Sequence, residues 1–380
     1  MASNNTQLGS VVVIGGCGFL GHHIVKELLA DPTVTSVSVM SRNPHKNRFD
    51  DVDPRVSYST GDITLASDVK GLVSRAKPDV VINTASPVAY INHEHAPSYE
   101  HVNVLGNENL LGASQAVGTV KAYIYTSSGP IIASSGGAYD QADETYPTLA
   151  QMSKSATSGG DPYHLAKARG DALVLGANDP SEGGMRTATI RPTAMYGEGD
   201  RQMIANLLDV HRQGNQTVWL GDNTALMDSV YVGSVARAHV LAARRLMASH
   251  SASYSGLKVD GEAFNITDDA PLPPWSFFRL FWIEMGDTTP LSKVWIIPNA
   301  VTLAMAEFAE WWTWTFSWGK LRPKLLIKER IEFLLYTRTY SIQKARERLG
   351  YEPVLPMAEA VRRAVKWALQ EWPEGSEISL

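Results

Sequence analysis

The chain has 380 residues, a formal net charge of −5 at pH 7 and a single cysteine. The charge offers no basic surface for nucleic acid, so we expect no nucleic-acid partner. The lone cysteine excludes an intrachain disulfide framework and a cysteine-cluster metal site, which makes a reducing compartment the default.

A glycine-rich turn follows the first predicted strand. It reads Gly15-Gly16-Cys17-Gly18-Phe19-Leu20-Gly21 and opens a segment with helical apolar spacing. A strand, a glycine turn and a helix in this order let backbone N–H groups at the helix N-terminus hold the pyrophosphate of a dinucleotide. We therefore predict that Gly15, Gly18, Phe19, Leu20 and Gly21 bind a dinucleotide cofactor, which is a nicotinamide dinucleotide if the motif at Tyr163 described below is catalytic.

Short β-rich runs alternate with helical patterns throughout the first half of the chain. Helices are predicted over Tyr99–Ala116 and Tyr163–Ala177, among others. The alternation and the almost wholly apolar strands predict an α/β fold of the Rossmann type. It has a doubly wound parallel sheet, with the ligand crevice at the carboxyl ends of the strands. The predicted strands are Val11–Ile14, Ser36–Met40, Arg55–Thr60, Val80–Thr84, Ala122–Thr126 and Arg186–Ile190.

The second informative motif is Tyr163-His164-Leu165-Ala166-Lys167. A phenol and an ammonium four residues apart share one face of a helix. We expect the Lys167 ammonium, aided by the positive nicotinamide ring, to lower the pKa of Tyr163, which can then take a proton from a substrate alcohol as hydride leaves. Lys167 would also hold the nicotinamide ribose. At the end of strand 122–126, either Ser127 or Ser128 can hydrogen-bond the substrate oxygen, because adjacent serines in extended backbone point in opposite directions.

After Arg191 the regular alternation ends. We predict helices over Arg201–Arg212, Gly233–Met247 and Met357–Leu369, and strands over Thr217–Leu220 and Ala263–Ile266, the latter returning to the main sheet. Residues 1–192, with 228–267 returning to them, are expected to form the dinucleotide-binding domain. Residues 193–227 and 268–380 are expected to form a smaller, mainly helical substrate-binding lobe.

One aromatic segment stands apart from the rest of that lobe. From Val294 to Trp318 it is rich in tryptophan, and only Glu307 and Glu310 interrupt its apolar run. These charges argue against crossing a bilayer but allow the segment to lie on one. Its alternatives are a buried helix pair beneath a substrate pocket, or a surface that meets lipid. We predict that it forms part of the wall or mouth of the substrate pocket.

The motifs together resemble the extended short-chain dehydrogenase/reductase family. Within that family they resemble the branch of the 3β-hydroxysteroid dehydrogenases and the decarboxylating sterol-4α-carboxylate 3-dehydrogenases. The matching segments, besides the two motifs above, are Tyr125-Thr126-Ser127-Ser128, Ala142-Asp143-Glu144-Thr145, Gly176-Ala177-Asn178-Asp179-Pro180, the run from Arg191 to Gln202, Asp228 to Gly233 with His239, and Tyr340 to Tyr351.

The resemblance implies further site residues. It places the catalytic serine at Ser128, beside Tyr163 and Lys167. It implies that Asp62 and Ile63 flank the adenine, that Ala85 and Ser86 line the cofactor, that Asn103 lies in the central helix, and that Pro192 abuts the nicotinamide carboxamide.

The end of the second strand departs from the family pattern. Family members that use NAD commonly carry an acidic residue there, whereas this chain has Met40-Ser41-Arg42. A guanidinium can pair with a 2′-phosphate, so Arg42 favours NADP, with NAD as the alternative and a solvated loop position as the other interpretation of Arg42. His93-Glu94-His95 suggests a metal, but no further ligand set accompanies it, so we expect no metal site.

These observations favour an NAD(P)-dependent oxidoreductase that oxidises a secondary alcohol of the 3β-hydroxyl type. Its substrate would be a small apolar molecule, sterol- or terpenoid-like, and a carboxylate next to the new ketone would be lost as CO2. The main alternative is an NADPH-dependent ketone or aldehyde reductase of the dihydroflavonol-reductase type. A nucleotide-sugar epimerase fits the apolar second lobe less well, and a non-catalytic scaffold fits the intact serine, tyrosine and lysine less well.

The location and assembly follow from the same sequence. The chain starts without a charged-then-apolar leader and has no long uncharged apolar stretch. We therefore expect it to be cytoplasmic or peripherally associated with the endoplasmic reticulum membrane. A peripheral membrane contact and a homodimer are both compatible with this sequence.

Overall fold

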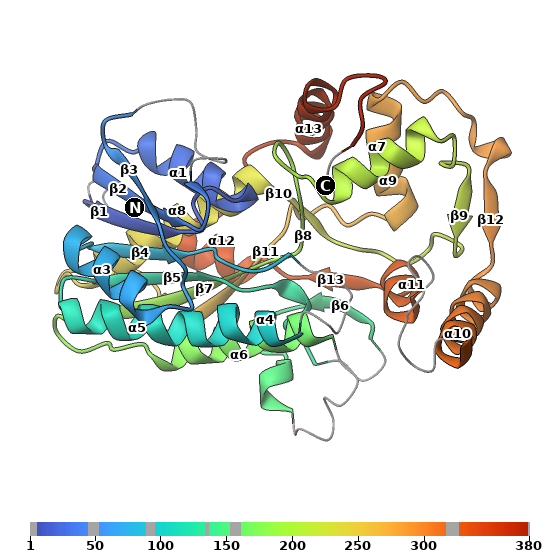
Figure 1. The fold of residues 1–380 in the computed structure, drawn as a ribbon. Helices are drawn as coiled ribbons and strands as arrows, with labels where there is room; N and C mark the ends of the chain where they lie inside the picture. Colours follow the sequence, from blue (N-terminus) through green and yellow to red (C-terminus); the bar gives the residue numbers. More distant parts are fainter. Residues whose placement is uncertain are drawn as a thin grey trace.

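A seven-stranded parallel sheet forms the centre of the molecule in the computed structural model, which describes residues 6–44, 53–88, 96–133, 137–152, 161–316 and 327–378 (Figure 1). The strand order is β11-β7-β5-β4-β1-β2-β3. Successive strands are added on one side of β1 up to β3 and on its other side from β4 onward, so the switch point lies between β1 and β4. This is the doubly wound arrangement predicted from the sequence. The strands are β1 (Gly9–Ile14), β2 (Val34–Ser41), β3 (Val56–Thr60), β4 (Val80–Asn83), β5 (Ala122–Thr126), β7 (Arg186–Pro192) and β11 (Glu262–Ile266).

Helices cover both faces of the sheet (Figure 1). On one face α1 (Phe19–Leu29) and α8 (Val232–Ser249) bury apolar side chains such as Ile24 and Val235 against the strands. On the other face lie α3 (Ala66–Ala76), α5 (Gly106–Val117) and α6 (Pro162–Gly176), which contribute Val69, Leu110 and Val174 to a second core. Because both faces are buried, the strands are apolar almost throughout.

The strand predicted over 263–266 does return to the main sheet. Strand β11 pairs in parallel with β7, with Phe264 opposite Ile190. The helix predicted over 99–116 is longer and less regular than expected. It begins as α4 (Ala96–Glu100), widens into a π-helical turn (His101–Leu105) that contains Asn103, and continues as α5.

The remaining elements form a second lobe beyond the carboxyl ends of the strands (Figure 1). Three short parallel pairs join distant segments: β8 with β10, β9 with β12, and β6 with β13. The strands are β6 (Tyr139–Ala142), β8 (Ala194–Tyr196), β9 (Val218–Leu220), β10 (Ser229–Tyr231), β12 (Trp295–Ile297) and β13 (Arg338–Tyr340). The helices of this lobe are α7 (Met203–Arg212), α9 (Pro274–Glu284), α10 (Asn299–Phe316), α11 (Lys328–Leu335) and α13 (Met357–Glu371). The helix α12 (Gln343–Leu349) instead packs against α8 and β11 of the sheet domain.

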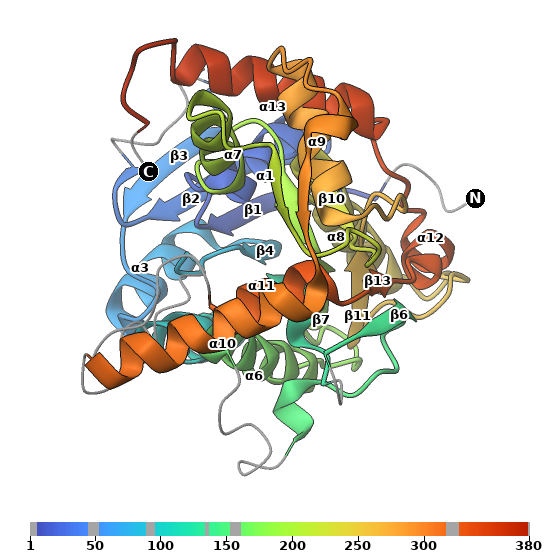
Figure 2. The same ribbon diagram turned by 90° about the vertical axis from the view of Figure 1, so that its right-hand side faces the viewer.

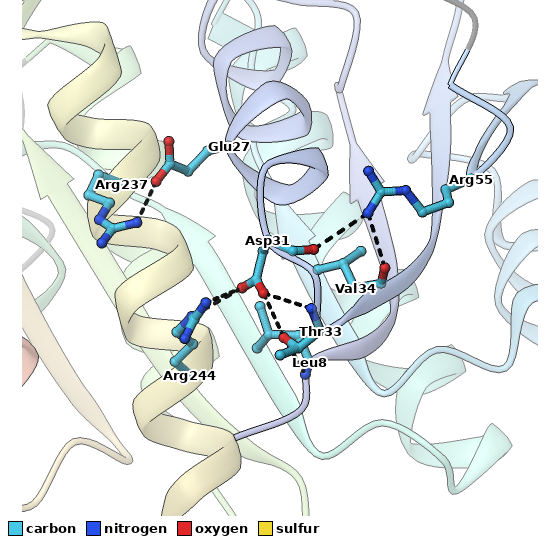
Figure 3. Close-up of polar contacts among 8 residues, drawn as sticks. All are labelled: Leu8, Glu27, Asp31, Thr33, Val34, Arg55, Arg237 and Arg244. Carbon is cyan, nitrogen blue, oxygen red and sulfur yellow. Dashed lines mark hydrogen bonds and ion pairs between the residues drawn. The ribbon is translucent and has the colours of Figure 1, made fainter. Parts of the chain in front are cut away.

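Two ion pairs tie α8 back to α1 at the sheet (Figure 3). Arg244 donates to the Asp31 carboxylate through Nη2 at 2.6 Å and Nε at 3.1 Å. Arg237 donates to Glu27 at 2.7 Å. The Asp31 carboxylate also accepts the backbone N–H and the hydroxyl of Thr33. The chain that returns from the second lobe is thereby anchored on α1 and on the turn that follows it.

The helix predicted over 357–369 is observed as α13, and only part of its apolar face is buried. Val361 and Val365 are buried, but Leu369 is 43% exposed. The buried face of α13 is instead completed by Ala360, Ala364 and Ala368.

The aromatic segment is not a buried helix pair. In α10 only Thr302 and Ala306 are buried, whereas Trp314 is 65% and Phe316 is 66% exposed. Figure 2 shows α10 running along the outside of the second lobe. Four tryptophans of the segment are at least half exposed: Trp295, Trp311, Trp312 and Trp314. No helix in the described part of the chain has the length and apolarity needed to cross a membrane.

Candidate active site

The glycine turn after β1 has the geometry of a pyrophosphate cradle. Gly15 has φ +77°, a conformation that favours glycine. A Cβ at Gly21 would lie 2.2 Å from the carbonyl oxygen of Gly15, so only glycine lets α1 pack this closely on the turn. At Gly18 the nearest atom to a Cβ is that same carbonyl at 3.2 Å, which leaves the approach to the backbone open. The three glycines thus meet the three requirements of a dinucleotide-binding turn: a positive φ at Gly15, an open approach to the backbone at Gly18 and close helix packing at Gly21.

The start of α1 adds the anion-binding part of this cradle. A helix leaves its first N–H groups without intrahelical partners, and here these belong to Phe19, Leu20 and Gly21. The first turn carries no acidic side chain that would repel a phosphate. The residues present therefore fit the pyrophosphate of a nicotinamide dinucleotide.

Residues after β4 lie against the same turn. The Thr84 hydroxyl donates to the carbonyl of Ile14 at 2.8 Å, and the backbone N of Ala85 lies 3.1 Å from the position of a Cβ on Gly15. The hydroxyl of the next residue, Ser86, donates to the carbonyl of Pro87 at 3.1 Å, and its side chain is close enough to Tyr163 to act on the pKa of the phenol. The turn, Ala85 and Ser86 thus line one crevice at the point where the strand order reverses, and this crevice leads to Tyr163.

The predicted catalytic side chains come from α6 and the end of β5. Asp161 caps α6 by accepting the N–H of Tyr163 at 3.0 Å. Lys167 is fully buried, donates to the carbonyl of Thr126 at 2.8 Å, and lies 6.0 Å from the centre of the Tyr163 ring. Ser128 is two residues after Thr126. The hydrogen bond from Lys167 therefore fixes the helix face beside the serine-bearing end of β5.

The two serines differ in their surroundings. Ser127 continues the ladder by donating its N–H to Ile190 and is 3% exposed, whereas Ser128 is 9% exposed. The hydroxyls of Ser127 and Thr193 are buried and have no hydrogen-bond partner among the described residues. They follow neighbouring strands, β5 and β7, with Pro192 at the end of β7. This edge of the sheet can accept a polar group such as a carboxamide.

Burial acts on the tyrosine and the lysine in a way that the sequence did not indicate. It raises the pKa of Tyr163 to about 12, although the Ser86 side chain works in the opposite direction. Burial also lowers the pKa of Lys167 to about 7. In the protein alone, burial therefore raises the pKa of Tyr163, and the expected lowering by Lys167 together with the nicotinamide ring stays a prediction. The lysine charge is only partly present at neutral pH, and loss of hydration dominates the phenol.

The buried hydrogen bond between Thr126 and His239, which lies next to Lys167, was not predicted from the sequence. The Thr126 hydroxyl hydrogen-bonds Nε2 of His239 at 2.8 Å, and Nδ1 of that ring lies 2.8 Å from the carbonyl of Val235. Burial lowers the pKa of His239 to about 4, so the ring is neutral at physiological pH. Thr126 therefore joins His239 on α8 through its side chain to Lys167 on α6 through its carbonyl.

A second buried network surrounds Asn103 in the π-helical turn. Its carbonyl accepts from Asn107 at 2.7 Å, and its side-chain oxygen accepts from Tyr125 at 3.3 Å. Its side-chain nitrogen is buried without a partner in the described part of the chain. The sequence placed Asn103 in the central helix correctly but did not indicate the π-turn that orients it.

The remaining predicted cofactor residues lie at strand ends on the same side. Ile63 is buried and packs against Gly106 of α5, while Asp62 accepts two hydrogen bonds from Thr64. Arg42 directly follows β2 and is exposed. The structure thus gathers the ends of β1, β2, β3 and β4 around the glycine turn.

No cluster of metal-ligating side chains exists among the residues that the structure describes. The predicted absence of a metal site is untested at His93-Glu94-His95, which lies outside the described residues.

Comparison with known proteins decides the family. The 3-beta hydroxysteroid dehydrogenase/isomerase family matches residues 12–298. This chain belongs to that family. A decarboxylating sterol-4-alpha-carboxylate 3-dehydrogenase of Candida albicans is 31% identical over 372 residues, 95% of this chain and 98% of the relative. A 3beta-hydroxysteroid-dehydrogenase/decarboxylase of Arabidopsis thaliana is 31% identical over 93% of this chain and 78% of the relative. A 3-beta-hydroxysteroid dehydrogenase of Mycolicibacterium neoaurum is 30% identical over 95% and 92%.

Solved structures support the fold. A UDP-glucose 4-epimerase of Thermotoga maritima superposes with a TM-score of 0.69 at 20% identity, covering 95% of this chain and 99% of that one. A dTDP-glucose 4,6-dehydratase of Bacillus anthracis, solved with NAD, gives 0.66 at 17% identity over 97% and 99%. At this identity they show the fold alone. Together with the family, the comparisons identify the protein as an NAD(P)-dependent oxidoreductase of the short-chain dehydrogenase/reductase type.

Proposed function

We propose that this enzyme oxidises the 3β-type hydroxyl of a sterol-like substrate and that a carboxylate on the neighbouring carbon then leaves as CO2. The observation that carries the proposal is the end-to-end similarity to decarboxylating sterol-4-alpha-carboxylate dehydrogenases. Tyr163, Lys167 and Ser128 supply the chemistry at a crevice that fits the cofactor. The sterol and hydroxysteroid names of the relatives favour this reaction over a dihydroflavonol-type reduction.

The proton and electron balance of the reaction assigns a role to each side chain. Bound NAD(P)+ supplies a hydride acceptor and a positive ring charge. Tyr163 takes the hydroxyl proton as the C–O bond becomes a carbonyl, and Ser128 donates a hydrogen bond to that oxygen. The bond to the neighbouring carboxylate then breaks, CO2 leaves, and its electron pair forms an enolate. Ser128 and protonated Tyr163 hold the enolate oxygen until carbon is reprotonated.

Lys167 has a positioning role in this scheme. Its ammonium donates to the carbonyl of Thr126, which directs the side chain along the face shared with Tyr163. From there it can also reach the nicotinamide ribose. The remaining contacts of the cofactor would come from Gly15, Gly18, Phe19, Leu20 and Gly21 at the pyrophosphate, Asp62 and Ile63 at the adenine, Ala85 and Ser86 along the crevice, and Pro192 at the carboxamide.

We propose NADP as the preferred cofactor. Arg42 is exposed directly after β2, where the adenosine ribose is expected, and Met40 and Ser41 before it carry no charge. An exposed guanidinium at this place can bind a 2′-phosphate through two parallel hydrogen bonds. The segment Met40-Ser41-Arg42 has no acidic side chain that could hold the two ribose hydroxyls of NAD.

We also propose that α10 contacts a lipid surface. Phe308, Trp311, Trp312 and Phe316 are at least half exposed, and no lysine or arginine interrupts the helix. The two acidic residues that do interrupt it both have a partner: Lys328 donates to Glu307 through Nζ and to Glu310 through its backbone N–H. Exposed indoles beside one paired and one hydrogen-bonded carboxylate suit the interfacial region of a membrane. A sterol substrate also partitions into lipid.

The domain division follows the crevice. Residues 1–192 and 228–267 would bind the dinucleotide, and residues 193–227 and 268–380 would bind the substrate. A homodimer remains a prediction from the sequence.

Product analysis tests the proposed reaction. The purified enzyme is incubated with NAD or NADP and a 4-carboxy-3β-hydroxysterol, and the products are separated by mass spectrometry. We expect the 3-ketosteroid that has lost the carboxyl carbon, with one reduced cofactor formed per CO2. Reduction of the cofactor without loss of CO2 would leave dehydrogenation but reject decarboxylation, and no reaction with any 3β-hydroxysterol would reject the substrate class.

A further inference from the structure

The short ribbon β6–β13 pairs residues about 200 positions apart in the sequence and contacts Gly129, the residue after Ser128. Arg338 pairs with Tyr139, and Tyr340 pairs with Ala142. The Tyr340 ring lies 3.0 Å from the position of a Cβ on Gly129, the residue that follows Ser128. The ribbon therefore packs directly on the backbone that carries the proposed catalytic serine.

Two tyrosine hydroxyls on this ribbon hydrogen-bond to each other, which leaves one O–H of the pair without an acceptor among the described residues. The Tyr139 and Tyr340 oxygens are 2.5 Å apart. In such a pair one hydroxyl donates to the other, and the accepting hydroxyl still carries its own proton. No other described residue hydrogen-bonds to either oxygen. Burial raises the pKa of both groups, so both remain protonated and one O–H is free to donate to a ligand.

Arg338 lies on the same strand face as Tyr340, two residues earlier. Its Nε donates to the carbonyl of Gly137 at 2.7 Å, and its guanidinium lies 5.7 Å from the Phe333 ring centre. These contacts hold the side chain without neutralising it. No described carboxylate forms an ion pair with Arg338, whereas Arg346 and Arg348 on the following helix both have acidic partners. Arg338 is only half-buried, and its two terminal nitrogens form no hydrogen bond with a described residue.

We infer that Arg338, together with the Tyr139–Tyr340 hydroxyl pair, binds the carboxylate of the substrate. The inference rests on the proposed function, since it concerns the carboxylate next to the alcohol that Tyr163 and Ser128 serve. That carboxylate is attached to the carbon beside the carbinol carbon, so it lies next to Ser128 when the alcohol is bound. A guanidinium and a phenol that donate to one carboxylate would select carboxylated sterols over sterols that lack the group.

The partial exposure of Arg338 is consistent with a later loss of CO2. The negative charge leaves the carboxylate as CO2 forms, so a very tight ion pair would stabilise the substrate and oppose that step. A half-buried, water-accessible guanidinium can bind the carboxylate without stabilising the bound substrate so strongly. The effect of Arg338 should therefore appear in kcat/KM for the carboxylated substrate more than in kcat.

The test compares two substrates with four variants. Initial rates are measured on a 3β-hydroxysterol with and without the 4-carboxyl group, using Arg338→Met, Arg338→Lys, Tyr139→Phe and, as a matched control, Arg75→Met. Arg75 is an exposed arginine on α3, so its removal changes the net charge equally. We expect Arg338→Met to lower kcat/KM about 10- to 100-fold on the carboxylated sterol and less than about threefold on the other, as for the loss of hydrogen bonds to a charged group. Arg338→Lys and Tyr139→Phe should show smaller losses with the same selectivity.

The outcomes separate the two claims. An equal loss on both substrates, in any variant that still binds the cofactor, would make Arg338 a packing residue and overturn the inference alone. An unchanged kcat/KM on the carboxylated sterol would do the same. If Arg338→Met does not fold, the Arg338→Lys and Tyr139→Phe ratios decide. Wild-type enzyme that oxidises neither sterol would overturn the proposed function, and the carboxylate site with it.

Discussion

Tyr163 and Lys167 share a helix face, but each side chain loses hydration when it is buried, and this sets their proton affinities. The phenol becomes harder to ionise and the ammonium easier to neutralise. A base with a pKa of about 12 is mostly protonated at neutral pH. In the proposed mechanism, the positive charge of an oxidised nicotinamide ring would favour the phenolate that removes the proton.

Tyr163→Phe removes the proton acceptor without changing the ring that packs on Tyr99. We expect turnover to fall at least about a hundredfold, the lower end for general acid–base catalysis, while cofactor affinity remains nearly unchanged. Steady-state rates and cofactor titration measure the two effects. Tyr146→Phe, at an exposed tyrosine, is the control and should behave as wild type. Near-normal turnover of the Tyr163 variant would remove it from the mechanism.

The same assignment fixes the sign of the pH dependence. Oxidation needs ionised Tyr163, and its raised pKa means that the ionised fraction grows as pH rises from 7 to 9. We expect kcat/KM for oxidation to increase over this range. Lys167 loses its proton near pH 7, which makes the slope shallower than the about tenfold per pH unit of a single essential base. A flat or falling profile would contradict Tyr163 as the base.

Arg42 offers a test of cofactor choice at a single side chain. Removing a guanidinium that binds a 2′-phosphate should weaken NADP binding by about 1.5–3 kcal/mol, whereas NAD lacks the phosphate and should be barely affected. Fluorescence titration of Arg42→Ala with both reduced cofactors gives the two affinities. If NADPH and NADH respond equally, Arg42 does not distinguish them.

At the residue scale, local motifs were the predictable part of the site. The glycine turn and the Tyr163/Lys167 pair depend on spacing within one turn and one helix, which a sequence displays directly. The contacts of Tyr163 with Ser86 and of Tyr340 with Gly129 join distant parts of the chain. No periodicity signals such contacts, and the pKa shifts arise from burial that only the folded chain defines.

At the scale of elements, the long buried strands could be predicted from the sequence, whereas the short ribbons could not. Strands β1, β2, β3, β4, β5 and β7 lie within about two residues of their predicted bounds, because a parallel sheet covered on both faces needs continuous apolar runs. The three-residue strand β13 carries too few residues for a pattern, and its partner β6 precedes it by about 200 positions. Hydrophobicity alone also left open whether α10 is buried or exposed, since its apolar composition is compatible with both.

The exposed aromatic face of α10 predicts lipid binding by this one element. Trp312→Asp combined with Phe316→Asp should weaken binding to phosphatidylcholine–sterol vesicles at least about tenfold, since each side chain loses on the order of 1 kcal/mol of apolar burial. Turnover of a short, water-soluble hydroxysteroid should be retained. Leu257→Asp changes an equally exposed apolar residue in the loop between α8 and β11, and serves as the control. Binding is measured by co-sedimentation and by the blue shift of tryptophan fluorescence.

Two outcomes would contradict this role. Wild-type protein that does not bind vesicles removes lipid as the occupant of the α10 face. Equal weakening by Leu257→Asp would show that binding depends on general apolarity and not on α10.

At the scale of the whole molecule, the chain leaves the sheet domain after β7 and returns to it in α8 and β11. The return is anchored where Arg244 meets Asp31 and Arg237 meets Glu27 (Figure 3). The two pairs differ in burial: the Asp31 side chain is 3% exposed, whereas the Arg237 and Glu27 side chains are 47% and 29% exposed. We therefore expect the Arg244–Asp31 pair to contribute more to the free energy of unfolding than the Arg237–Glu27 pair.

Asp31→Asn should lower the free energy of unfolding at pH 7 by about 1–3 kcal/mol, because four charge-assisted hydrogen bonds to a buried carboxylate are weakened or lost. Glu27→Gln, the matched control, should cost at most about 1 kcal/mol, as exposed ion pairs do. Burial alone would raise the pKa of Asp31, but the hydrogen bonds from Thr33 and the charge of Arg244 outweigh it and lower that pKa. A carboxyl with a lowered pKa stabilises the fold above its unfolded pKa of about 3.9, and the contribution is lost as pH falls through the folded value. The difference between wild type and Asp31→Asn, measured by urea unfolding, should therefore be constant from pH 8 to 5 and shrink below about pH 4. A difference that persists undiminished in acid, or equal losses for both substitutions, would show that the carboxylate charge does not anchor α8.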